Sequence, residues 1–562
     1  MKILSIYTKI KISHFVWLGF TGIFLLAGVI GHDPWKQDET YSFGIIYHFY
    51  TAHSWLVPKN AGVPFMEKPP LYYWTAVIFC KIFGGLLPLH DSARLASFFY
   101  MAVAAIFLWK AAKIIFRNSP QDEKMEWVAL AFFLGTLGIV RHAHDMFTDV
   151  ALLAGSTIAL YGMVLLTCVN DSWKKAGVWF GIGIGVAFLS KGLFIPVILG
   201  LGAVFLLIIL KEIRTRDTMR ALVVAVFVAA PFLLIWPICL YNYSYPLFMQ
   251  WFWENNVGRF LGFSVARLGA GNQPGYIAYS AFWFAFPVFP LALFSAIRQK
   301  SQWQEPEYAL PVAMVGTGLA FLLISASARA LYLLPLIPMF TLLATRGAAD
   351  IPGKFLVFWN MAARFCYLIA IVAIWVIWLA LQKAHPLPRL LPSIASVLPV
   401  DFVPSYTQWG AVAVSIAATL FFLASLRLDG GTKAGTAGIW FSGIATVWIT
   451  TSTLLLPWIN ETKSYRPVLA QMNSYIKHSS YSNDCMNTCN LGESIAPMLE
   501  YFSDGHALNT VQSFSDAHCP LILTVTGKAE AEDSRMGWTL VWKGSRVLDA
   551  KDEELRLYAR QQ

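Results

Sequence analysis

Long, nearly uninterrupted apolar runs dominate the first 458 residues of the chain. A helix needs about 20 mostly apolar residues to cross the hydrocarbon core of a bilayer. Thirteen runs approach this length, at 14–31, 93–115, 126–140, 150–168, 176–190, 193–210, 221–241, 276–296, 308–325, 330–345, 365–381, 408–426 and 437–457. The pattern predicts an α-helical polytopic membrane protein with about thirteen transmembrane helices.

A fourteenth apolar run, at 69–85, could be a further span, and the placement of lysine and arginine in the loops decides against it. With thirteen spans and a cytoplasmic N-terminus, 20 lysines and arginines lie on the inner side and 12 outside, leaving the C-terminal tail aside. Counting 69–85 as a span would move every later cationic loop outward, although lysine and arginine favour cytoplasmic loops. We therefore predict an interfacial helix there, with Tyr72, Tyr73 and Trp74 at headgroup level, inside a long first periplasmic loop at 32–92.

The pattern changes abruptly after residue 458. Short apolar runs such as LILTV and WTLVW alternate with helical patterns at 464–478 and 493–503. This alternation predicts a small soluble α/β domain of ordinary size. The chain is thus expected to divide into a transmembrane domain, 1–458, and a periplasmic domain, 459–562.

The composition agrees with a membrane protein and excludes several other classes. The chain is 57% hydrophobic and 13% charged, with a mean hydropathy of +0.56, whereas soluble proteins carry about 25% charged residues. A cytosolic enzyme or a disordered chain would not carry 22 Trp, 22 Tyr and 41 Phe. The net charge of +10 is explained by the inner-side cations and predicts membrane lipids, not nucleic acid, as partners.

Seven cysteines are too few and too scattered for a secreted disulfide scaffold. Three of them, Cys485, Cys489 and Cys519, lie in the tail. An oxidising compartment permits one disulfide among these three, with one thiol left over. Three thiols are the alternative.

Eight ionisable residues stand at the ends of predicted spans or in outer loops. Ionisable groups at membrane depth are costly and usually functional. The eight residues are Asp38, Glu39, Glu67, Lys68, Asp149, Lys191, Arg259 and Arg329. In the thirteen-span topology, independent loops deliver all of them to the periplasmic face.

Structural explanations also exist for these charges. Asp38 and Asp149 could cap helix N-termini, where an acid interacts favourably with the helix dipole. Lys68 could be a solvated loop charge. Lys191 and Arg329 could anchor the chain at the headgroups by snorkelling. The functional interpretation depends on the convergence of acids and cations on one face.

This mixture of charges suits the transfer of a group from a lipid phosphate. An anionic leaving group needs cations near its oxygens, which Lys68, Arg259 and the other cations would supply. An acceptor hydroxyl needs a carboxylate as general base, for which Asp38 and Asp149 are the candidates. Phosphate leaves without a partner acid, unlike the two-carboxylate arrangement of glycoside hydrolysis. The pattern therefore favours sugar transfer over hydrolysis.

At these residues the sequence resembles the membrane glycosyltransferases of the GT-C superfamily, above all the protein O-mannosyltransferases and the bacterial transferases that add aminoarabinose to lipid A. The resemblance covers roughly the first 345 residues and rests on six motifs in matching order and topological position. In chain order these are Asp38-Glu39-Thr40, Glu67-Lys68-Pro69-Pro70-Leu71-Tyr72-Tyr73-Trp74, Thr148-Asp149, Ser190-Lys191-Gly192, Asn256-Val257-Gly258-Arg259-Phe260 and Tyr332-Leu333-Leu334-Pro335-Leu336-Ile337-Pro338.

The resemblance implies an inverting hexosyl- or pentosyltransferase with a polyprenyl- or dolichyl-phosphate sugar donor and no nucleotide-sugar site. Carried onto this chain, it implies that Asp38 is the catalytic base and that Asp149 is a second acid of the cavity. It also implies that Lys68 and Arg259 contact the donor phosphate.

The same resemblance assigns the remaining residues to substrate binding. These are Glu39, Glu67, Lys191 and Arg329. Glu67 contacts a divalent metal in some relatives, so a divalent metal is the one cofactor that the resemblance raises, without implying dependence on it. Arg329 lies in ASARALYLLP, where many relatives carry a lysine, and is expected to replace that cation.

A sugar transfer at the periplasmic face of the bacterial inner membrane is therefore the favoured function. The alternative is a transporter or flippase for a lipid-linked substrate, which would hold its ionisable residues near the bilayer midplane on broken helices. Lipid A, a protein and a glycan all stay open as the acceptor, because acceptor pockets of this superfamily lie in variable loops and in the tail.

Overall fold

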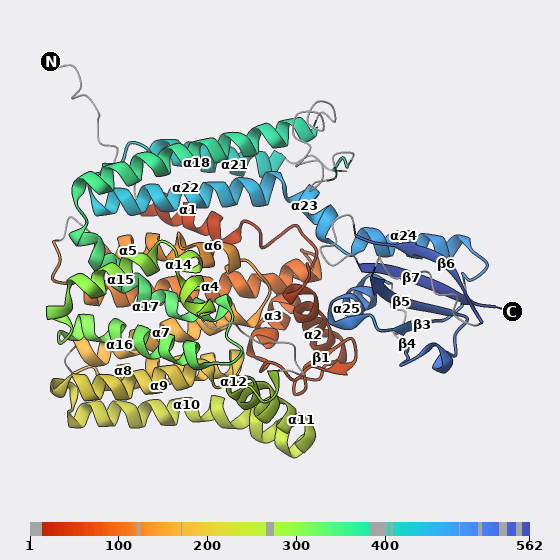
Figure 1. The fold of residues 1–562 in the computed structure, drawn as a ribbon, viewed down its shortest axis with the longest axis horizontal. Helices are drawn as coiled ribbons and strands as arrows, with labels where there is room; N and C mark the ends of the chain where they lie inside the picture. Colours follow the sequence, from red (N-terminus) through yellow and green to blue (C-terminus); the bar gives the residue numbers. More distant parts are fainter. Residues whose placement is uncertain are drawn as a thin grey trace.

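The computed structural model describes residues 14–120, 124–169, 171–265, 275–382, 399, 402–404, 409–482, 484–503, 509–527, 537–546 and 553–561. Long, roughly parallel helices form a slab, and a small unit that contains a sheet projects from one end of it (Figure 1). The first outer loop, residues 32–92, lies between the slab and this unit (Figure 1).

Helices account for nearly all of the slab. Their bounds are α1 (His14–Leu26), α2 (Asp38–Ala52), α3 (Leu71–Phe83), α4 (Leu89–Ile115), α5 (Met125–Leu134), α6 (Leu137–His142), α7 (Thr148–Cys168), α8 (Trp173–Lys191), α9 (Phe194–Ile209), α10 (Arg216–Tyr243), α11 (Tyr245–Met249), η3 (Gln250–Gly258), α12 (Arg259–Leu261), α14 (Tyr276–Phe284), α15 (Val288–Arg298), α16 (Pro306–Ile324), η5 (Ala330–Leu336), α17 (Ile337–Gly347), α18 (Gly353–Gln382), α21 (Trp409–Ser425), α22 (Lys433–Leu454) and α23 (Leu456–Lys463). The two short strands β1 (Lys59–Asn60) and β2 (Val63–Pro64) pair within the first outer loop.

Each of the thirteen predicted apolar runs falls on helical structure. Within the described residues, six helices are long and apolar enough to cross a membrane, or eight if each of two bent pairs counts as one span. The six are α4, α7, α10, α16, the continuous η5–α17 and α18. A polytopic membrane fold is therefore clear, and the count of thirteen stays a prediction.

Three runs predicted as single spans are interrupted. The run 276–296 forms α14 and α15, which meet at an angle of 107°. Pro287 lies at this bend, and proline lacks the N–H that would continue the helix. The run 437–457 bends by 66° between α22 and α23, and 126–140 divides into α5 and α6. Hydropathy alone does not register such breaks, because the residues around them are as apolar as the rest.

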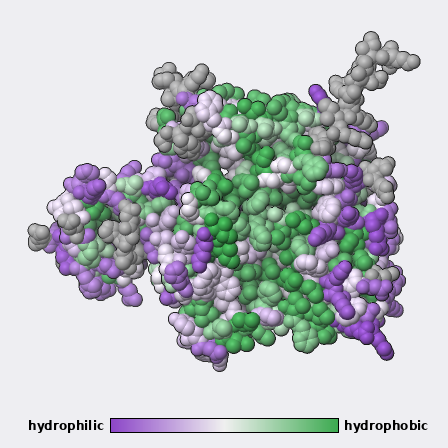
Figure 2. Space-filling model, turned by 180° about the vertical axis from the view of Figure 1, so that it is seen from behind, coloured by the Kyte–Doolittle hydropathy of each residue, from purple (hydrophilic) through white to green (hydrophobic). Residues whose placement is uncertain are grey.

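The surface of the slab divides by polarity in the way that a membrane requires. A broad apolar belt covers the middle of the slab, and hydrophilic residues gather toward its two ends and on the projecting unit (Figure 2). Helices satisfy their backbone hydrogen bonds internally, which is why they can present such a belt to lipid.

The segment 69–85, predicted as an interfacial helix, contains the helix α3, and two of the three aromatic side chains at its start are buried in the protein. Tyr72 and Tyr73 are fully buried. The Tyr72 hydroxyl shares a hydrogen bond of 2.7 Å with Ser97 of α4, and the Trp74 indole donates to the carbonyl of Trp55. The Tyr72 and Trp74 rings therefore fasten α3 to the protein, since the polar tip of each has a protein partner.

The tail forms a mixed five-stranded sheet. The strand order is β4-β3-β5-β7-β6, with β3 parallel to β4 and β5, and β7 antiparallel to β5 and β6. The elements are α24 (Arg466–His478), β3 (Met486–Cys489), α25 (Gly492–Phe502), β4 (Asn509–Thr510), β5 (Leu521–Gly527), β6 (Trp538–Gly544) and β7 (Glu553–Arg560). Cys485 and Cys519 form a disulfide, and Cys489 lies outside it. An α/β tail is thus observed, whereas the limits 1–458 and 459–562 stay a prediction.

An ion pair between the buried Asp33 and the exposed Arg466 fastens the tail to the first outer loop. The Asp33 carboxylate accepts hydrogen bonds from Arg466 at 2.5 to 3.1 Å and from Ser464 at 2.8 Å. Burial acts to raise the pKa of Asp33, but the hydrogen bond and charge of Arg466 outweigh it and hold this pKa below its usual value. Nearby, α2 and α25 touch at Gly44, where an added Cβ would lie 2.5 Å from Pro497.

We expect Arg466→Met to loosen the tail, because it leaves the buried Asp33 carboxylate without its guanidinium. The free energy that holds the tail to the first outer loop should fall by about 2 kcal/mol, the size of a hydrogen bond to a charged group. Limited proteolysis of the purified protein, which would release the tail faster, measures this effect. Lys477→Met, an exposed lysine on the same helix, is the control, and equal cleavage of both variants would contradict the role of the ion pair.

Candidate active site

Seven of the eight predicted residues line one cavity of about 630 Å³. The cavity lies where the first outer loop meets the ends of several helices of the slab. Its predicted members are Asp38, Glu67, Lys68, Asp149, Lys191, Arg259 and Arg329. Helices that run in alternating directions therefore bring residues from distant parts of the sequence to the same end of the slab, as the topology predicts.

Asp38 and Lys68 are joined by the phenol of Tyr41. Tyr41 donates a hydrogen bond of 2.5 Å to Asp38 Oδ1 and accepts one of 2.6 Å from Lys68 Nζ. Burial and the nearby charge of Asp38 raise the pKa of Tyr41 well above its usual value, so the phenol stays a donor. The Lys68 side chain is also buried, with 9% of the residue exposed.

The buried Lys68 ammonium has no counter-ion among the residues that the structure describes. No carboxylate there lies within 4.0 Å of it, and its hydrogen-bond partner is the neutral Tyr41. Burying a charge without a partner is costly. A bound anion would compensate that charge, so Lys68 is a candidate anion-binding group of the cavity.

Arg259, at the start of α12, is paired with Glu67. The Arg259 Nη2 donates to Glu67 Oε1 at 2.6 Å, and the backbone carbonyl of Arg259 accepts from Ser327 at 3.0 Å. Its Nε is buried and has no hydrogen-bond partner in the described protein. This Nε could therefore donate to a ligand while the Nη2 stays on Glu67.

Asp149 and Lys191 form the second ion pair of the cavity. The Lys191 ammonium also lies 4.3 Å from the centre of the Tyr332 ring, a favourable cation–π distance. The second carboxylate oxygen of Asp149 is buried without a partner in the described residues. This pair offers an anchored cation and a spare acceptor to a ligand.

Small residues allow the two helices that carry this pair to approach closely. A Cβ added to Gly183 of α8 would overlap the backbone of Ala159 in α7, and one added to Gly162 of α7 would overlap the backbone of Phe180 in α8. Membrane helices often pack through such small residues. The contact places Asp149, in the first turn of α7, beside the last residue of α8.

Asn256, from the fifth sequence motif, positions the chain rather than entering the ion pairs. Its side chain accepts a hydrogen bond from the Leu193 N–H at 3.2 Å and donates one to the Trp251 carbonyl at 2.8 Å. It lies against Gly192, whose φ of +81° is in the region that favours glycine. Asn256 thus ties the segment before Arg259 to the end of α8.

Glu39, the eighth predicted residue, does not line the cavity. Its carboxylate accepts hydrogen bonds of 2.9 Å from Arg94 Nε and from the Met146 N–H, and one of 3.2 Å from the Trp35 N–H. Only 6% of Glu39 is exposed. It therefore holds the first outer loop to α4 and to the 143–147 turn.

Arg329 lines the cavity as an exposed cation. It forms no ion pair with the residues that the structure describes. Its position agrees with the expected replacement of a lysine by this arginine, and its exposure distinguishes it from the buried Lys68.

Two residues of the cavity are absent from the predicted set. Tyr41 lies one helical turn after Asp38, so the i, i+3 spacing was a signal that it shares the face of that acid. Glu493, at the start of α25, comes from the tail, and no sequence signal connects it with the first loop. Desolvation and the carboxylates of Glu67 and Asp38 raise the pKa of Glu493.

The residues around Glu67 do not fit a metal site. Its carboxylate is already paired with a guanidinium, which opposes the binding of a cation. Within the described part of the chain, no group of three or more His, Cys, Asp and Glu side chains is arranged to hold a metal ion. The Glu67 carboxylate is thus placed to hold the Arg259 guanidinium and not a metal ion.

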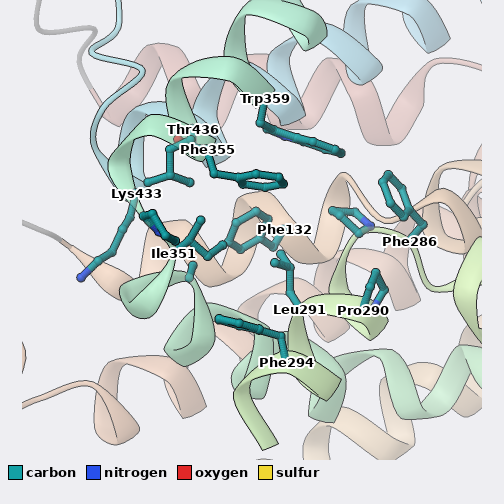
Figure 3. A pocket seen from close by; sticks show the side chains of 14 residues that line it. Phe132, Phe286, Pro290, Leu291, Phe294, Ile351, Phe355, Trp359, Lys433 and Thr436 are labelled. Carbon is teal, nitrogen blue, oxygen red and sulfur yellow. The ribbon is translucent and has the colours of Figure 1, made fainter. Parts of the chain in front are cut away.

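A second cavity, of about 410 Å³, lies between α5, α15 and α18 and offers no chemistry of this kind. Aromatic and aliphatic side chains, among them Phe132, Phe294 and Trp359, point into it, while the ammonium of Lys433 points away (Figure 3). Its described lining contains no acid. The polar cavity is therefore the candidate active site.

We expect Gly192→Ala to destabilise the candidate site. A residue with a Cβ costs about 1–2 kcal/mol in the left-handed region, and here the Cβ would also overlap the Asn256 side chain. Thermal unfolding in detergent should show a lower midpoint. Gly200→Ala, on α9 with no heavy atom near the added Cβ, is the control; an unchanged midpoint for Gly192→Ala would contradict this interpretation.

Comparison with known proteins agrees with this architecture. The family model described as dolichyl-phosphate-mannose-protein mannosyltransferase matches residues 67–236. Two relatives are undecaprenyl phosphate-alpha-4-amino-4-deoxy-L-arabinose arabinosyl transferases. The one from Yersinia pestis is 24% identical over 337 residues, 56% of this chain and 55% of that protein. The one from Proteus mirabilis is 26% identical over 294 residues, 50% of this chain and 48% of that protein. The matched segment thus spans about half the length of these relatives.

The structural likeness extends over nearly the whole chain. The crystal structure of ArnT from Cupriavidus metallidurans bound to undecaprenyl phosphate has a TM-score of 0.67 and 15% sequence identity, and the alignment covers 97% of both chains. At this identity the match establishes the fold. In its fold and in its matched sequence, the chain is similar to the membrane glycosyltransferases of the GT-C superfamily, as its motifs indicate.

Proposed function

We propose that this protein is a glycosyltransferase that moves a sugar from a polyprenyl-phosphate donor to an acceptor hydroxyl. The observation that carries the proposal is the cavity in which a carboxylate, Asp38, lies one phenol away from Lys68, a buried cation without a counter-ion. A phosphate would supply the missing negative charge, and the carboxylate would serve as the base.

In the proposed reaction, Asp38 accepts the proton of the acceptor hydroxyl. The acceptor oxygen bonds to the anomeric carbon while the bond from that carbon to the phosphate oxygen breaks, and the electron pair leaves with the polyprenyl phosphate. Lys68 and the Arg259 Nε stabilise the charge that develops on the phosphate. One displacement inverts the anomeric carbon. Asp149 and Lys191, which also line the cavity, would orient the reactants.

The donor and acceptor are proposed from the relatives. The two arabinosyl transferases are named for undecaprenyl phosphate and 4-amino-4-deoxy-L-arabinose, and we propose the same donor class, and hence a pentosyl transfer, for this chain. Lipid A is the acceptor that we favour, because the resemblance includes transferases that modify it. If the acceptor is a protein or a glycan instead, analysis of the reaction product would identify it.

We further propose that the cavity and the tail lie in the periplasm of a bacterium and that the N-terminus is cytoplasmic. The excess of lysine and arginine on the opposite side of the thirteen-span topology supports this orientation. The apolar belt of the slab supports placement in the inner membrane (Figure 2).

The rival function, transport of a lipid-linked substrate, is less consistent with the positions of the charges. Transporters hold ionisable groups near the midplane on broken helices. Here Asp38 and Asp149 are in the first turns of their helices, Lys191 is the last residue of α8 and Arg259 begins α12. Charges at the helix ends serve a reaction at the membrane surface.

We expect Asp38→Asn to lower turnover by about 10²–10⁴-fold, the usual contribution of a general base. Binding of undecaprenyl phosphate should persist, since the phosphate contacts are cations. Purified protein, an undecaprenyl phosphate-linked aminoarabinose donor and lipid A, with mass spectrometry of the product, provide the assay. Asp516→Asn, on an exposed turn of the tail, is the control. Retained sugar transfer by Asp38→Asn would refute the assignment of the base.

We expect Lys68→Ala to weaken binding of undecaprenyl phosphate by about tenfold or more, because it removes a charge-assisted hydrogen bond. Lys68→Arg should restore little of this affinity, since a planar guanidinium does not fit a position shaped for an ammonium. The dissociation constant in detergent measures both effects. Lys81→Ala removes an exposed lysine of α3 as the control, and parental affinity in both Lys68 variants would exclude the phosphate role.

A further inference from the structure

Tyr41 occupies an unusual position between two opposite charges. It lies three residues after Asp38 in the first turn of α2, and its hydroxyl is the atom that both Asp38 and Lys68 contact. Within the described residues, the Asp38 carboxylate and the Lys68 ammonium do not come within ion-pair distance of each other. A carboxylate and an ammonium so close in a partly dehydrated cavity attract strongly.

A direct ion pair between these two groups would harm both proposed roles. A carboxylate that is paired with an ammonium is a weaker base, because the cation favours its charged form. The same pairing would occupy the ammonium that is to bind a phosphate. The cavity already contains two direct pairs, Glu67 with Arg259 and Asp149 with Lys191, so neighbouring acids and cations in this cavity do form direct pairs.

We infer that Tyr41 is a positioning residue that acts as a neutral spacer between the proposed base, Asp38, and the proposed phosphate ligand, Lys68. One hydroxyl suffices because it donates to the carboxylate and accepts from the ammonium at the same time. The Asp38 carboxylate and the Lys68 ammonium each keep a hydrogen bond without forming an ion pair with each other. Each therefore has bonding capacity left for a substrate. This inference rests on the proposed function.

The ring of Tyr41 is held firmly enough for this role. Only 4% of the residue is exposed, and its ring stacks on Phe65 with centroids 5.0 Å apart and an angle of 23° between the planes. Burial also keeps the phenol protonated, because its pKa is raised well above the usual value. A flexible polar side chain would allow the charges to swing together, whereas a packed aromatic ring keeps its hydroxyl in place.

Two substitutions of Tyr41 distinguish a role of its hydroxyl as spacer from a purely structural role of its ring. Tyr41→Phe keeps the ring and its stacking but removes the hydroxyl, so Lys68 becomes free to pair with Asp38. Tyr41→Gln loses the ring but carries both a donor and an acceptor, which can bridge the two groups. We expect turnover to fall by about tenfold or more in Tyr41→Phe, the size of a lost hydrogen bond to charged groups, and to be higher in Tyr41→Gln. A structural role predicts the opposite order, and that order would overturn the inference.

Binding of undecaprenyl phosphate tests the spacer without any turnover. In Tyr41→Phe the dissociation constant should rise by about tenfold, because Asp38 now competes for Lys68. In the double variant Tyr41→Phe/Asp38→Asn no ion pair can form, and affinity should return to within about twofold of the parent, a coupling typical of residues in contact. Parental affinity in Tyr41→Phe, or no recovery in the double variant, would overturn the inference.

The same experiments distinguish this inference from the proposed function. If the parent protein binds undecaprenyl phosphate but transfers no sugar, the proposed function fails while the binding cycle still decides the role of Tyr41. If the parent is active and Tyr41→Phe matches it in turnover and affinity, the inference about Tyr41 is refuted while the proposed function stands. Tyr47→Phe, on the same helix but outside the described cavity lining, is the matched control and should resemble the parent in both measurements.

Discussion

The high cost of placing a charge in hydrocarbon governs the layout of this protein. Because lipid offers no partner for an ionised group, acids and cations collect at the ends of the helices, and the middle of the slab stays apolar (Figure 2). Several helices end beside the first outer loop, so their terminal charges meet there. The candidate active site is a consequence of this crowding, in which Asp149, Lys191 and Arg259 arrive from different helices.

The same cost explains why one buried charge outside the cavity, Arg94, has so many hydrogen-bond partners. Arg94 is fully buried in α4, and its guanidinium donates to Glu39, Asp91 and the backbone carbonyls of Val29 and His32. Such a network fixes the entry of the first outer loop, and the Asp33–Arg466 pair then fixes the tail to that loop. Within the cavity, by contrast, Lys68 and the Arg259 Nε keep unused bonding capacity. This contrast with Arg94 marks these two cations of the cavity as candidate ligand-binding groups.

The sequence predicted the helical membrane class, the α/β tail and eight site residues, seven of which line the cavity, because motifs next to apolar runs indicate helix ends. It failed at Glu39, since neighbours on a helix point about 100° apart: Asp38 shares its face with Tyr41 rather than with Glu39. It missed the bend at Pro287 and the buried faces of Tyr72 and Tyr73, because hydropathy does not report packing. It also missed Glu493, which only tertiary structure brings to the first loop.

The charges that line the cavity cancel. Among its described lining residues there are four acids, Asp38, Glu67, Asp149 and Glu493, and four cations, Lys68, Lys191, Arg259 and Arg329. A neutral pocket exerts little long-range pull on dissolved ions, so free phosphates of the surrounding medium gain no electrostatic advantage in reaching it. A ligand tethered to the bilayer needs no such guidance, because it arrives by lateral diffusion and meets Lys68 only at contact distance. Electroneutrality would in this way act as a filter against soluble competitors.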